Sequence, residues 1–71
     1  MATGSPTLLR HLRRARELTL MDVAAKTGVH YTTLSHIERG IVKPSEPQAN
    51  ALAGYFGRPI GRLLAPPGIA A

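Results

Sequence analysis

The sequence predicts an all-α fold, a compact bundle of about five short helices, and three observations support this prediction. The chain has 71 residues, which is enough for one domain. Hydrophobic residues make up 44% of it, but with no Trp, one Phe and two Tyr the core must consist mainly of aliphatic side chains. These apolar residues recur at helical spacing between residues that begin and end helices.

The first helix is expected at residues 6–17. Ser5 can serve as its N-cap, and Pro6 suits the first helical position, where a backbone N–H is not needed. Apolar side chains at positions 8, 9, 12 and 15 form the inner face. The other face carries arginines, at least half of which we expect to be solvated: Arg10, Arg13, Arg14 and Arg16.

A second helix is predicted to begin after Thr19, which can cap it together with Asp22 at the third helical position. Gly28 ends this helix, because glycine readily adopts the left-handed conformation found just past a helix end. Val29 then folds back onto the helix. The residues expected to face inward are Val23, Ala24 and Thr27.

The third predicted helix runs from Tyr31 to Arg39 and is stopped by Gly40. Leu34 and Ile37 lie three positions apart, so they share one face. The residues that point elsewhere are Tyr31, Thr32, Ser35 and His36. This helix is therefore short and mostly polar.

A fourth helix opens at Pro44 and Ser45 and is ended by Gly57. Pro47 falls in its first turn. The side chains available for the core are Leu52, Ala53 and Phe56.

A last apolar turn is predicted from Ile60 to Leu64, after Pro59. The folded domain therefore covers residues 6–64. We expect a flexible N-terminus at residues 1–5 and a flexible tail at residues 65–71.

The composition of the chain indicates which classes of partner it can bind. Nine Lys and Arg against four Asp and Glu give a formal charge of +5, which attracts a polyanion, so nucleic acid is the first candidate and an acidic membrane surface the second. The absence of cysteine excludes disulfides and thiolate zinc sites and fits a reducing cytoplasm. No apolar run has the length of a signal or membrane segment, and the arginine-rich residues 10–16 suit the fold better than a transit peptide. We expect a cytoplasmic protein, associated with the nucleoid when bound to DNA.

Residues 19–39 have the organisation of a helix-turn-helix, two short helices joined by a tight turn that contains glycine. Each key position has a structural reason. Ala24 is small where two helices cross closely, and Gly28 lies at the turn. Leu34 and Ile37 hold the second helix against the first.

The stretch from Leu18 to Gly40 resembles the lambda repressor and Cro type of DNA-binding proteins, also called the XRE family, and Ile37-Glu38-Arg39-Gly40 is its most telling part. The likeness extends to residues 7–64. It implies a sequence-specific regulator of transcription, taken to be a repressor, whose helix from Tyr31 enters the major groove of duplex DNA. No cofactor and no small-molecule ligand are implied.

The resemblance also implies roles by position. Three side chains fall where family members reach base edges: Tyr31, Thr32 and His36. Leu20 falls where members often carry glutamine; it can touch a thymine methyl or simply pack, and packing is favoured. Phosphates are held at three positions: Thr33, Arg39 and Lys43.

Two further features follow from the resemblance. Arg13 and Glu38 match a pair that forms a salt bridge in family members; the alternative is two solvated charges. Family members also pair near their last helix, so we expect a homodimer on a palindromic operator. The apolar residues of this segment can form that interface or close the monomer core instead: Ile60, Leu63 and Leu64.

Other function classes fit less well. A catalytic or metal set would need His11, His30 and His36 to converge with Ser5, Ser35 or Asp22, but the sequence spacing separates them, so we expect no enzyme. A protein-interaction adaptor on the same fold is the alternative function; it would not need basic residues flanking an exposed polar helix. RNA binding is disfavoured because no aromatic stacking platform is visible.

Overall fold

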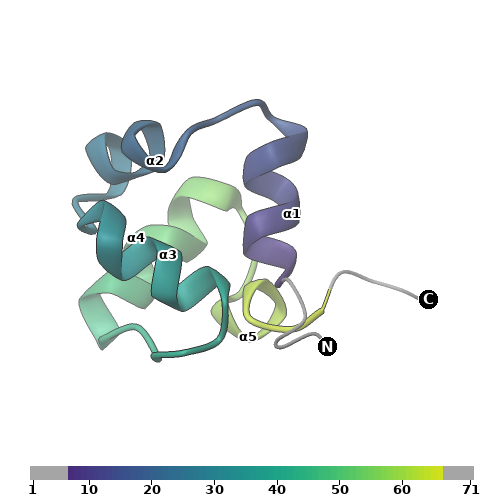
Figure 1. The fold of residues 1–71 in the computed structure, drawn as a ribbon. Helices are drawn as coiled ribbons and strands as arrows, with labels where there is room; N and C mark the ends of the chain where they lie inside the picture. The colour runs from purple at the N-terminus through teal and green to yellow at the C-terminus, as the bar shows by residue number, and fades with distance from the viewer. Residues whose placement is uncertain (1–6, 67–71) are drawn as a thin grey trace.

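The structure is a computed structural model that describes residues 7–66, and within this range it contains five helices and no strand. The helices are α1 (Leu8–Ala15), α2 (Leu20–Thr27), α3 (Tyr31–Glu38), α4 (Glu46–Phe56) and α5 (Ile60–Leu63) (Figure 1). Helix α2 packs against α3 and α4, and α5 packs against α4 and α1. The all-α prediction is confirmed. The flexibility predicted for residues 1–5 and for residues 67–71 concerns positions outside the described residues.

Helix α1 is shorter than predicted at both ends. Thr7, rather than Ser5, is its N-cap, and the Thr7 Oγ1 atom accepts a hydrogen bond of 3.3 Å from the Arg10 backbone N–H. The same hydroxyl donates to the backbone carbonyl of Glu38 at 3.0 Å, so a tertiary contact fixes where the helix begins. At the other end Glu17 adopts a left-handed φ of 57°, which ends the helix before residue 17.

The caps of α2 form as predicted. The Thr19 hydroxyl accepts from the Asp22 N–H at 3.0 Å, and the Asp22 carboxylate accepts from the Thr19 N–H at 2.8 Å. Gly28 ends the helix with a left-handed φ of 79°. Helix α3 then begins one residue after His30, whose Nδ1 accepts from the Thr32 N–H at 3.2 Å. An imidazole therefore takes the capping role that serine, threonine, aspartate or asparagine usually fills.

The C-terminal part of the domain lies beside the start of α1. Ser45 caps α4 and Gly57 ends it with a left-handed φ of 71°, as predicted. After α5, the Ala65 carbonyl accepts a 2.7 Å hydrogen bond from the Leu8 N–H. Figure 1 shows α5 beside the start of α1. Ala65 lies in the predicted flexible tail, yet this bond ties its backbone to the first turn of the domain.

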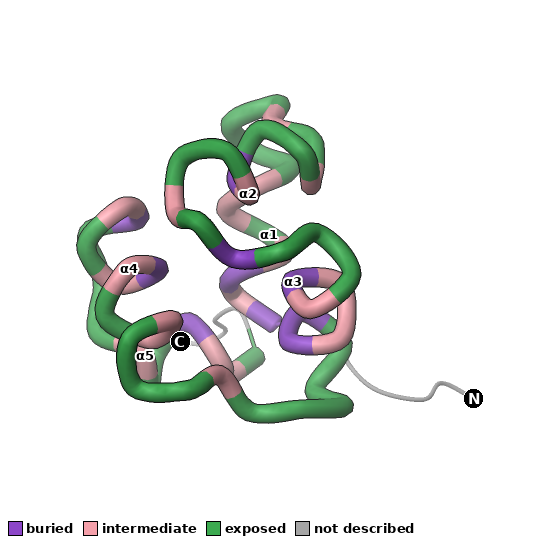
Figure 2. The backbone as a smooth tube through the Cα atoms, turned by 90° about the vertical axis from the view of Figure 1, so that its left-hand side faces the viewer, coloured by how far each residue is buried: buried purple, intermediate pink, exposed green. Residues whose placement is uncertain are grey.

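The core receives at least one apolar side chain from each helix. Figure 2 shows the buried positions of α3 and α4 turned towards the interior, while the connecting loops are mostly exposed. Leu63 of α5 is fully buried within the single chain, which favours the interpretation that it closes the monomer core. The buried hydrophobic residues are Leu9, Val23, Val29, Leu34, Ile37, Leu52, Phe56 and Leu63.

Candidate nucleic-acid interface

Helix α3 has a buried side and a polar side. Leu34 and Ile37 are fully buried and fix the helix on the core. Of the predicted base-contacting residues, Tyr31 and Thr32 are exposed, whereas His36 is half-buried. Tyr31 stacks on the neighbouring His30 with a ring separation of 4.7 Å. The first turn of α3 is therefore the part most open to a large partner.

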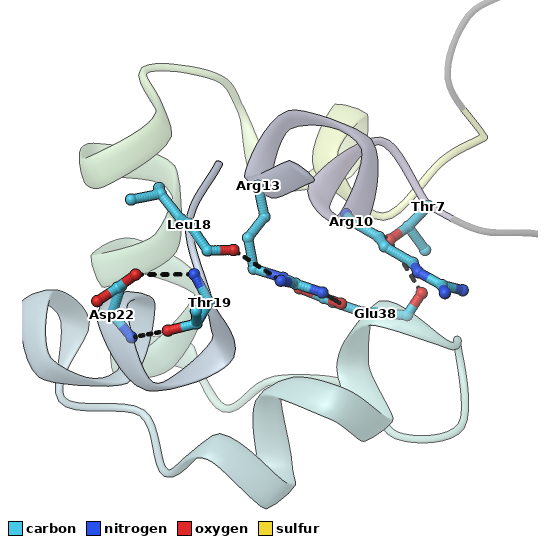
Figure 3. A network of polar contacts seen from close by, with 7 residues as sticks. All are labelled: Thr7, Arg10, Arg13, Leu18, Thr19, Asp22 and Glu38. Carbon is cyan, nitrogen blue, oxygen red and sulfur yellow. Dashed lines mark hydrogen bonds and ion pairs between the residues drawn. The ribbon is translucent and has the colours of Figure 1, made fainter. Parts of the chain in front are cut away.

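The end of α3 is joined to α1 by an ion pair. Arg13 Nε donates to Glu38 Oε2 at 2.6 Å, and Arg13 Nη2 donates to Glu38 Oε1 at 3.1 Å. The remaining Arg13 nitrogen, Nη1, donates to the Leu18 carbonyl at 2.8 Å, just before α2 (Figure 3). Both side chains are largely buried, with 12% and 4% exposure. The pair expected from the resemblance is present, and one arginine fixes the relative positions of three helices.

The start of α2 is less positive than a bare helix N-terminus. The backbone N–H of Thr19, followed by its hydroxyl, lowers the pKa of Asp22 below its ordinary value of 3.8, so this carboxylate is charged at neutral pH. A negative charge at this end opposes the approach of a phosphate. Leu20, the first residue of α2, is half-buried and packs against the core, as the favoured interpretation of this residue predicted.

The predicted phosphate contacts differ in exposure. Arg39 and Lys43 are exposed on the segment that follows α3, and Thr33 is half-buried on α3 itself. Between the two cations, Ile41 and Val42 are 60% and 40% exposed. The segment therefore offers cations and aliphatic side chains together.

A basic hollow of about 400 Å³ lies where α1 meets the start of α2 and the end of α3. We call it the arginine hollow. Sequence reasoning expected at least half of the four α1 arginines to be solvated, and it missed that Arg10 and Arg14 line this hollow. The available signal was the spacing of four between them, combined with the Arg13–Glu38 pair that brings α1 to α3. The lining residues are Arg10, Arg13, Arg14, Leu20, Ser35, Glu38 and Arg39.

The histidines do not form a common site. His11 lies on α1, His30 precedes α3 and His36 lies near the end of α3. Among residues 7–66 no group of three metal-ligating side chains is placed to hold an ion. The same part of the chain contains no helix that is long and apolar enough to cross a bilayer.

Comparison with known proteins places the chain in a family. The sequence profile described as a helix-turn-helix domain matches residues 7–65. The chain is 41% identical over 59 residues to uncharacterized HTH-type transcriptional regulators of Mycobacterium bovis and of two Mycobacterium tuberculosis strains. Each match covers 79% of this chain but 23% of the relative, so the chain spans about a quarter of the length of those proteins. No solved structure matches the chain. The chain belongs to the helix-turn-helix domain family of the lambda repressor and Cro type.

Proposed function

We propose that this domain binds duplex DNA in a sequence-specific manner and regulates transcription, with α3 in the major groove. The observation that carries the proposal is the polar side of α3, held rigidly by the Arg13–Glu38 pair and flanked by exposed cations. The family supports it, as does the name of the mycobacterial relatives, HTH-type transcriptional regulators. A rigid helix with cations beside it meets the two needs of such binding, base readout and phosphate neutralisation.

Base readout falls to the polar side of α3. Thr32 can hydrogen-bond a base or place its methyl against thymine, and His36 can bond guanine N7 or O6. Tyr31 stands at the exposed first turn. None of these is a bidentate reader such as Arg or Asn, so specificity is built from several modest contacts. Leu20 contributes at most an apolar contact, because its side chain is half-buried against the core.

Phosphate contacts from Thr33, Arg39 and Lys43 position the helix. Two copies would occupy a palindromic operator with recognition helices roughly 34–36 Å apart, one turn of DNA. Because Leu63 is buried within one chain, while Ile60 and Leu64 keep some exposure, we place pairing on the DNA rather than in the free protein. Occupancy of an operator is sufficient for repression, the output we propose.

The test is selection of bound duplexes from a random pool, followed by sedimentation of the protein with the enriched sequence. The proposal predicts an enriched palindrome, two chains per duplex, and loss of binding when about five base pairs are inserted between the half-sites. A pool that stays random after repeated selection would contradict sequence-specific binding. One chain per duplex at saturation would contradict the dimer alone.

A protein-interaction adaptor is the second candidate, because a shallow and mostly apolar hollow of about 430 Å³ lies where α2 meets the start of α3. Met21, one of its lining residues, is 61% exposed. The same selection separates the two candidates, since an adaptor would enrich no duplex. The hollow is lined by Met21, Ala24, Ala25, Gly28, Val29, His30 and Tyr31.

A further inference from the structure

We propose that Arg10 and Arg14 of α1, together with Arg39 after α3, form a clamp for one phosphate of the DNA backbone. The clamp lies in the arginine hollow and extends the binding surface beyond the helix-turn-helix at residues 19–39. This inference rests on the proposed function and adds a second helix to the DNA contact. Its ligand chemistry is a phosphate oxyanion, and its source is the duplex in which α3 reads the bases.

The two α1 arginines share one face of their helix. Residues four positions apart are neighbours on a helix surface, so Arg10 and Arg14 lie on consecutive turns. Arg13, between them in sequence, is held by Glu38 and Leu18 and keeps this stretch of α1 beside the end of α3. Arg39 directly follows α3, so arginines line the hollow from two separate segments.

The charge balance of the hollow calls for an anion. Glu38 is its one acidic lining residue, and Arg13 compensates it with two hydrogen bonds. Across residues 7–66 this is the single ion pair, so Arg10, Arg14 and Arg39 have no acidic partner in the described part of the chain. Positive charges gathered around one hollow repel one another, and a bound phosphate relieves that repulsion. Guanidinium groups also match the geometry of phosphate oxygens.

The shape of the hollow selects a phosphate that belongs to a polymer. At about 400 Å³ it is larger than a single anion needs, and it is open to solvent rather than enclosed. A phosphate of the DNA backbone is bonded to a nucleoside on each side, so it can enter a site only if the site is open at both sides. Ser35 on α3 lines the same hollow, so the clamp and the reading helix adjoin one another. Phosphates border both edges of the major groove, where a contact beside the reading helix would fall.

The first experiment measures the affinity of R10Q/R14Q for the selected duplex across a salt series. The control is K26Q/R58Q, which also lowers the formal charge of +5 by two but alters exposed cations that lie outside both the hollow and α5. We expect R10Q/R14Q to bind about tenfold more weakly and to flatten the plot of log affinity against log salt by about 0.9 per phosphate lost. Equal effects of the two double variants would mean that net charge alone acts, and would overturn the clamp. Matching melting curves establish that R10Q/R14Q is folded.

The second experiment locates the phosphate. Single neutral methylphosphonates are stepped along the selected duplex, and each duplex is titrated with wild type and R10Q/R14Q. The clamp predicts one position per half-site where the wild type loses clearly more affinity than R10Q/R14Q, in which Arg39 alone remains of the clamp. Identical scans for both proteins would overturn the clamp while leaving DNA binding intact. Failure of the wild type to bind any duplex would overturn both the clamp and the proposed function.

A third arm separates the two phosphate sources. Inorganic phosphate is added to the DNA-free protein, and the arginine Nε resonances are followed by NMR. The clamp predicts that phosphate causes small changes in the chemical shifts of these resonances, and that a short duplex displaces the bound phosphate. Tight phosphate binding that persists beside a bound duplex would assign the hollow to a free anion and contradict the proposal.

Discussion

Arg13 Nε donates to Glu38 Oε2 across 2.6 Å and thereby joins α1 to the last turn of α3. The Thr7 hydroxyl adds a second tie to the same residue through the Glu38 carbonyl. The end of α3 is therefore fixed by the side chain and the backbone of one glutamate. A reading helix held in this way presents its polar side without reorganising on binding, which lowers the cost of complex formation.

Removing one member of this pair should destabilise the domain. R13M leaves the Glu38 carboxylate, 4% exposed, without its cation, and removal of one partner of a buried pair costs about 3 kcal/mol or more. The double variant R13M/E38M should recover much of that loss, because neither charge is then left buried alone. Urea unfolding of the three proteins measures this. If R13M were as stable as the wild type, the Arg13–Glu38 pair would behave as two solvated charges and would not contribute to stability.

Core packing should depend on the inner side of α3. L34A removes a fully buried side chain and should lower the free energy of unfolding by about 2–5 kcal/mol, a large share of the stability of so small a domain. M21A provides the control, since Met21 is 61% exposed and its truncation should change stability by less than about 0.5 kcal/mol. Thermal unfolding followed by circular dichroism compares them. Comparable losses would mean that α3 is not anchored as described.

The α2 capping box should make stability depend on pH. Because the pKa of Asp22 is lowered on folding, its carboxylate stabilises the fold above 3.8, and the contribution fades as pH falls below that value. The difference in Tm between wild type and D22A should therefore be widest at neutral pH and narrow in acid. A difference that is constant from neutral to acid pH would show that the charge of Asp22 is not involved.

Local signals in the sequence were sufficient for the helix-turn-helix itself. Thr19, Asp22 and Gly28 are cap and stop residues that act within a few positions, so α2 could be bounded from the sequence alone. The start of α1 could not be predicted in this way, because the Thr7 hydroxyl that caps the helix is also held by its bond to the distant Glu38 carbonyl. Sequence patterns indicate interactions between residues that are close along the chain, whereas this contact joins residues 31 positions apart.

The arginine hollow could not be predicted from the sequence for the same reason, because it is formed by segments that are distant in the sequence. Helical spacing placed Arg10 and Arg14 on the outer face of α1, but only the three-dimensional structure shows that Arg39 lines the same hollow. The Arg13–Glu38 pair was available from family resemblance and not from charge pattern. Leu63 could belong to an interface or to the core, and its complete burial in one chain decides between them for this residue.

Phosphate neutralisation should be measurable as a salt effect. R39A or K43A removes an exposed cation beside α3 and should weaken binding to all duplexes alike. Each should flatten the slope of log affinity against log salt by about one unit per contact. Titrations of the selected and a shuffled duplex at several salt concentrations test this. Unchanged slopes in both variants would remove these residues from the interface.

The proposal that the polar side of α3 reads DNA sequence is tested by comparing wild type with H36A on the selected duplex and on a shuffled one. We expect H36A to lose about 1–3 kcal/mol on the selected duplex and little on the shuffled one, because a base contact exists only at the correct site. The substitution leaves the buried residues of the helix, Leu34 and Ile37, in place. Equal losses on both duplexes, or no preference of the wild type for either, would contradict base readout by α3.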